Sequence, residues 1–71
     1  MSNRQAEMVE IKVLRFVHHT NDAELVLVVE QYGNEVERWI PASQIHSITR
    51  HIDGSGSMRI TPWIAKQKGL R

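Results

Sequence analysis

Four histidines are the residues of this chain best suited to chemistry, because imidazole nitrogens bind transition metals and exchange protons near neutral pH. They are His18, His19, His46 and His51, in a sequence of 71 residues without cysteine. Neighbouring residues of a strand point to opposite faces, so His18 and His19 cannot act together there. No carboxylate completes a metal-ligand spacing with either pair. We therefore predict no metal and no cofactor.

The serines of the glycine-rich stretch "DGSGS", residues 53–57, are the next candidates for catalysis. A phosphate-binding loop would be longer and would carry a lysine, and a nucleophilic serine would need an elbow between a strand and a helix. This stretch has neither context. We predict no catalytic residues and a protein that works by binding.

The length predicts a single domain over residues 1–71 with a thin core, because small chains bury a smaller share of their surface. Apolar residues make up 41% and charged residues 24% of the sequence, as in ordinary globular domains. The longest apolar run is only five residues, 25–29, and the polar start does not resemble a signal peptide. We expect a cytoplasmic protein, no membrane contact, and disorder over residues 1–6.

Alternation of apolar and polar residues predicts strands in the first half of the chain. Val9, Ile11 and Val13 alternate with charged residues, and the register then breaks at "LRFV", as in a bent strand. The segment "AELVLVVEQ" is apolar on both faces and follows the turn formers "HHTND". Gly33 and Asn34 predict a hairpin to "VERWI".

The segment 43–50 is ambiguous. Ile45, Ile48 and Ile52 lie three and four residues apart, as on a helix, whereas Ile48, Arg50 and Ile52 alternate, as on a strand. We favour a tight turn over 41–44 followed by a strand, because the "DGSGS" loop then joins that strand to "MRIT" in a second hairpin.

The closing segment "RITPWIAKQKGLR" predicts one short helix over residues 62–68. Thr61 can cap it, Pro62 fits its first position, and Gly69 suits the left-handed residue after its last turn. So short a helix must be held by packing. We expect Trp63, Ile64 and Leu70 to pack into the end of a bent sheet, and we place Trp39 in the core with them. The alternative is that the two tryptophans are exposed and contact a partner protein.

These elements predict a mainly β fold: a small bent antiparallel sheet or half-barrel of four or five strands with one short C-terminal helix. Charge is uneven along it. Residues 1–37 hold seven acids and three bases, whereas residues 38–71 hold six bases and one acid. This distribution indicates either a dipolar surface or an even mixture of both signs after folding.

Two stretches resemble small proteins encoded by bacteriophages and prophages, with the pattern W-I-P-x-S-Q-I followed by I-P-x-W-[LI]-A-x-x-K-G-L. The first match is "WIPASQI" over 39–45, and the second is "ITPWIAKQKGL" over 60–70, in which Thr61 is an extra residue before the proline. The resemblance covers about half of the chain. It implies a source in a bacterial host and a size class, but no common activity.

By this resemblance we expect an accessory protein that acts by protein–protein contact, for example an inhibitor of host machinery or of a host defence such as a CRISPR effector. The alternative is a small β-barrel module that binds nucleic acid, since the late basic residues could contact phosphates. We also expect a homodimer. The candidate partner-binding residues are Tyr32, Arg38, Arg50, Arg59, Lys66, Lys68 and Arg71.

Overall fold

The first two strands form one polypeptide arm that bends at Leu14 and contributes to two different sheets. The structure, a computed structural model, describes residues 7–70, so the expected disorder of residues 1–6 and the position of Arg71 lie outside the described part. Its elements are β1 (Val9–Val13), β2 (Arg15–His19), β3 (Ala23–Val29), β4 (Glu35–Pro41), the 3-10 turn η2 (Ala42–Gln44), β5 (Ile45–Arg50), β6 (Gly56–Ile60) and α1 (Pro62–Gln67).

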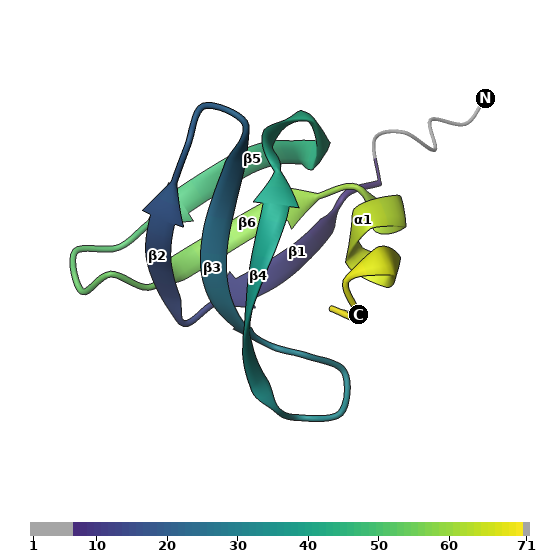
Figure 1. Ribbon diagram of the computed structural model, residues 1–71, viewed down its shortest axis with the longest axis horizontal. Coiled ribbons are helices and arrows are strands. Elements are labelled where there is room, and N and C mark those ends of the chain that lie inside the picture. Colours follow the sequence, from purple (N-terminus) through teal and green to yellow (C-terminus); the bar gives the residue numbers. More distant parts are fainter. Residues whose placement is uncertain (1–6, 71) are drawn as a thin grey trace.

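The strands form two antiparallel sheets of three, in the orders β1-β6-β5 and β2-β3-β4. In Figure 1 the strands of the β2-β3-β4 sheet cross in front of the other sheet at a steep angle. Among residues 7–70, β4 and β5 are joined by η2 but do not pair, so the barrel stays open. The predicted mainly β fold with one short C-terminal helix is confirmed.

The core lies between the two sheets and is built from the inward-facing row of side chains of each strand. Met58 on β6 stands between Ile11 on β1 and Ile48 on β5, while Val26 and Val28 of β3 face them from the other sheet. This inward placement follows from the two-residue period of a strand. The remaining buried positions of the core are Val13, Ile40, Ile60, Ile64, Ala65 and Leu70.

The ambiguous segment 43–50 is a turn followed by a strand, as we favoured. Pro41 ends β4 and precedes the single 3-10 turn of η2, after which β5 pairs with β6. The isoleucine spacing is explained by an irregularity in the pairing between Ile45 and Ser47, which shifts the register by one residue. Both Ile45 and Ile48 therefore pack on the core, although they are three residues apart.

Helix α1 closes one end of the gap between the sheets (Figure 1). The Thr61 hydroxyl accepts a hydrogen bond from the Ile64 amide at 3.2 Å, and Gly69 has the left-handed φ of 70° that we predicted. The Leu70 amide donates to the Ala65 carbonyl at 2.8 Å, which turns Leu70 back onto the core. The predicted burial of Ile64 and Leu70 is confirmed.

The predicted burial of Trp63 is wrong, because 59% of this residue is exposed. The buried stripe of this short helix is formed by the successive residues Ile64 and Ala65. Trp63 lies beside that stripe, on the side toward solvent. Two small or medium side chains and Leu70 suffice to fill this end of the core.

Candidate functional site

The outer face of the β2-β3-β4 sheet carries an apolar surface that the core does not use. Strand β3 has Val26 and Val28 on its inner face, so the alternating residues Leu25, Leu27 and Val29 lie on the outer face. Leu25 and Leu27 are half-buried by their neighbours on the sheet, and Val29 is exposed. The segment that is apolar on both faces thus covers the core with one face and leaves the other toward solvent.

Trp39 extends this surface onto β4. It pairs with Leu25, and directly opposite residues of antiparallel strands point to the same face. On the other side Leu25 pairs with His18, whose ring meets the Trp39 ring edge-on, with 6.2 Å between ring centroids. Because Trp39 remains 43% exposed, the prediction that it belongs to the core is wrong. We call Leu25, Leu27, Val29 and Trp39 the outer apolar face.

Charged residues border this face. Leu27 pairs with Arg15 on β2 and with Glu37 on β4, so one cation and one anion flank it on the same side of the sheet. Glu35 lies opposite Val29 at the far end. An apolar centre with a charged rim is the usual make-up of a protein-binding surface.

The other exposed aromatic residues lie elsewhere. Tyr32 is 80% exposed in the loop between β3 and β4, where its amide donates to the Glu30 carboxylate. Trp63 lies on α1, at the end of the gap between the sheets. Neither belongs to the outer apolar face as defined by the strand pairing, although Tyr32 was a candidate partner-binding residue.

The predicted basic residues do not form one surface. Arg59 lies on the outer face of the β1-β6-β5 sheet, opposite Glu10 and Ser47, whereas Arg50 shares the inner face of the same sheet with Ile48. Arg38 is on the inner-face row of β4, between Val36 and Ile40, and donates to the Glu37 carbonyl at 3.1 Å.

Lys66 and Lys68 lie at the end of α1, where cations favour the helix dipole. Lys66 is exposed and Lys68 is half-buried. The C-terminal Arg71 lies beyond the described residues. Both lysines thus lie at the helix end, whereas Arg50 points from the inner face of its sheet toward Glu24.

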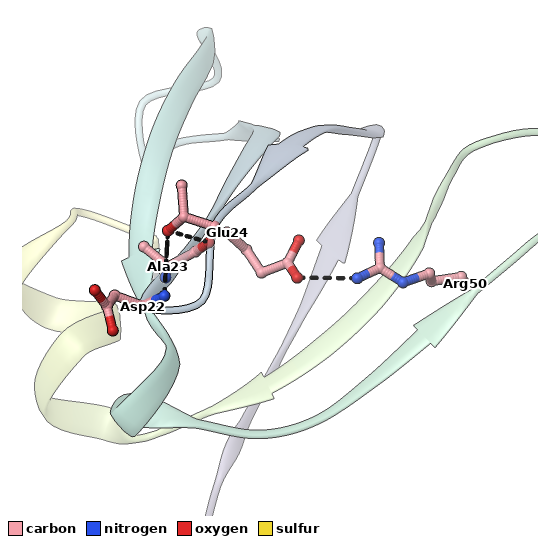
Figure 2. Close-up of polar contacts among 5 residues, drawn as sticks. Asp22, Ala23, Glu24 and Arg50 are labelled. Carbon is pink, nitrogen blue, oxygen red and sulfur yellow. Dashed lines mark hydrogen bonds and ion pairs between the residues drawn. The ribbon is translucent and has the colours of Figure 1, made fainter.

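Arg50 instead joins the two sheets. Its guanidinium donates to the Glu24 carboxylate of β3 at 2.9 Å and lies over the Phe16 ring of β2, 4.4 Å from the ring centroid. Figure 2 shows the two side chains meeting across the gap between the sheets. The Glu24 side chain is 13% exposed and the Arg50 side chain 48%, so the ion pair is shielded from water only on the Glu24 side.

The loop between β5 and β6 is fastened by Asp53. Its carboxylate accepts from the Ser55 hydroxyl at 2.7 Å and from the Ser55 amide at 3.0 Å. These two hydrogen bonds hold the pKa of Asp53 below its ordinary value of 3.8. The two bonds tie Asp53 to Ser55 within the glycine-rich loop.

The outer apolar residues of β3, and Glu24, were not named as candidate site residues from the sequence. The signal for Glu24 was its position two residues before Val26 and four before Val28, because that spacing places an acid on a buried row. The signal for the outer apolar face was a strand that is apolar on both sides within a chain too short to cover both.

Within residues 7–70, no three histidine or acidic side chains gather where they could hold a metal ion. No helix in this described part is long and apolar enough to cross a membrane. Comparison with protein-family models, with curated proteins and with solved structures finds no match to this chain.

Proposed function

We propose that this chain is a non-catalytic binding module that holds a partner protein against the outer apolar face. The observation that carries the proposal is an apolar row on the outer sheet face, in which Leu25 and Leu27 are half-buried and Val29 and Trp39 are exposed. Contiguous exposed apolar surface with a polar rim marks interaction sites in small soluble domains. A tryptophan near its margin is the residue type that most often dominates binding energy.

A protein partner is favoured over nucleic acid by the placement of the basic residues. Phosphate recognition needs several cations on one surface, usually with stacking rings between them. Arg50 and Arg59 lie on opposite faces of their sheet, and Arg50 is already paired with Glu24. The rim of the outer apolar face holds both signs of charge, which suits a protein surface.

The resemblance to small phage proteins adds a direction for the search. We propose that the partner is a protein of a bacterial host and that binding inhibits it, with components of host defence as the first class to examine. A second copy of the chain could occupy the same face, because apolar sheet faces also form homodimers.

The experiment compares three forms of the purified chain as bait for bacterial host proteins. The wild type is matched with Trp39→Glu, which places a charge in the outer apolar face, and with Tyr32→Ser, which removes an exposed aromatic away from it. We expect one protein to be retained by the wild type and by Tyr32→Ser, and lost from Trp39→Glu. Reconstitution with that purified protein should show a loss of affinity of at least about tenfold.

Thermal melting of all three forms is the control, because a bait that has unfolded would also lose its partner. Equal retention by a folded Trp39→Glu variant would contradict the proposed surface. Sedimentation identifies self-association, which Trp39→Glu should then abolish. A mobility shift with DNA that weakens steeply with salt, and that survives Trp39→Glu, would support the nucleic-acid alternative instead.

A further inference from the structure

A cavity of about 380 Å³ opens between the two sheets, on the side where the β2–β3 turn faces η2 and the start of β5. Its lining includes Thr20 and Asn21 from the turn, Ala42 from η2, and Ile45, His46 and Ile48 from β5. Small-molecule sites in proteins have volumes of roughly 300–1,000 Å³ and combine apolar walls with a few polar groups. The cavity is separate from the outer apolar face, which lies on the other side of the β2-β3-β4 sheet.

Glu24 is the acidic group in the wall of this cavity. It occupies the inner row of β3, where Val26 and Val28 are buried, and one of its oxygens accepts from Arg50 at 2.9 Å. The second oxygen, Oε1, is buried and has no hydrogen-bond partner within residues 7–70. Native proteins rarely leave a buried acceptor unpaired, because each one lowers stability unless something donates to it.

The charges already present at the site limit which chemical groups could donate a hydrogen bond to Oε1 of Glu24. Arg50 already balances the negative charge of Glu24, so a cation would gain little there and would compete with the guanidinium. A neutral N–H group can bond to Oε1 and leave the ion pair intact. Ile45, Ile48 and Ala42 offer apolar walls for a flat body attached to that group.

The geometry points to a binding site for a small neutral ligand that presents an N–H donor to Glu24 from a flat apolar body. Two sources supply this chemistry: primary carboxamides and amino-substituted nitrogen heterocycles such as nucleobases. For the ligand to reach Oε1, which is buried in the free chain, the carboxylate must rotate and bring this oxygen to the cavity wall while the other oxygen keeps Arg50. The polar end of the ligand faces the polar part of the lining, which includes Asn21 and His46.

The test is a titration of the isotope-labelled chain, followed by the amide signals of the residues that line the cavity. Benzamide and acetophenone form the decisive pair, because they differ only in an NH₂ against a CH₃ beside the same carbonyl. We expect benzamide to bind at least about tenfold more tightly, as the loss of one hydrogen bond to a charged group predicts. Guanosine and nicotinamide separate the heterocycle source from the carboxamide source, and benzamidine tests a cation.

Two variants locate the site. Glu24→Gln should weaken benzamide binding about tenfold, while Glu35→Gln, an exposed acid on β4, should leave it unchanged. Ala42→Phe fills the cavity from an exposed position and should abolish binding without lowering the melting temperature, so the test holds even where Glu24→Gln fails to fold.

The proposal is overturned by equal affinities for benzamide and acetophenone, by undiminished binding to Ala42→Phe, or by the absence of shifts at the cavity up to about 10 mM ligand. Trp39→Glu serves as a further control. Because Trp39 lies on the outer face of the sheet, this variant should bind benzamide like the wild type, whatever becomes of the partner protein.

Discussion

The two sheets of this protein have inner faces of similar chemical character, but one outer face is apolar and the other is polar. Both inner faces supply the aliphatic core, with Val26 and Val28 on one side and Ile11 and Met58 on the other. The outer face of the β2-β3-β4 sheet carries the outer apolar face. The outer row of the β1-β6-β5 sheet is polar and consists of Glu10, Lys12, Ser47, Thr49, Ser57 and Arg59.

The difference shows which apolar residues folding requires. A three-stranded sheet needs one apolar face to cover a core, and the β1-β6-β5 sheet demonstrates that a polar second face is compatible with the fold. The outer apolar face adds little to the core and raises the risk of aggregation. Its presence is therefore better explained by binding than by folding.

The largest expected effect of a substitution lies inside the sheet with the polar outer face. A Cβ atom added at Gly56 would stand 1.9 Å from the Thr49 carbonyl oxygen and 2.9 Å from the Phe16 ring. Neither backbone atom nor packed ring can yield that far, so Gly56→Ala should cost about 4 kcal/mol or more. Urea unfolding measures this loss, and a variant as stable as the wild type would show that the strand can shift.

The helix repeats the contrast between inner and outer residues on a small scale. Ile64 is buried and Trp63 is mostly exposed, so Ile64→Ala should cost about 3 kcal/mol and Trp63→Ala less than about 1 kcal/mol. Thermal melting of both variants tests the order. A larger loss of stability for Trp63→Ala than for Ile64→Ala would indicate that Trp63 belongs to the core.

A direct comparison of the two outer faces pairs Trp39→Thr with Thr49→Val. Trp39 is partly buried against its neighbours, so Trp39→Thr should cost about 1–2 kcal/mol, and Thr49→Val on the polar face should change the free energy of unfolding by less than about 0.5 kcal/mol. Binding of an apolar dye to the native protein should fall for Trp39→Thr. Unchanged dye binding by Trp39→Thr would contradict the proposal that the outer apolar face is exposed and the opposite outer face is polar.

The smallest expected effect concerns the loop that joins β5 to β6. Because the pKa of Asp53 is lowered in the folded chain, its ionised form favours folding. This contribution is complete above the unfolded pKa and is lost as the pH falls below about 4 through the folded value. Between pH 5 and pH 2.5 the free energy of unfolding should fall slightly less for Asp53→Ala than for the wild type. Superimposable curves of this free energy against pH would show that the carboxylate has no role.

Local patterns predicted the elements that depend on local physics. The turn at Gly33, the cap at Thr61 and the left-handed Gly69 follow from backbone geometry and hydrogen bonds between near neighbours. The alternation of β1 likewise predicted which of its residues point inward. These features need no knowledge of the rest of the chain.

The candidate sites were decided by contacts between distant segments. Composition suggested that both tryptophans fill the core, but the aliphatic residues of two sheets and the helix fill it, which leaves Trp39 and Trp63 toward solvent. The late basic residues share a region of sequence, yet strand alternation sends Arg50 inward to Glu24, which lies 26 residues away.

The sequence by itself determined the strands, the two hairpins and the capped helix, because propensity, turn chemistry and periodicity act over a few residues. Only the tertiary structure decided which face of β3 is covered and which charges meet. A strand that is apolar on both faces can bury either one, and the choice depends on the packing of the other sheet and α1 against it.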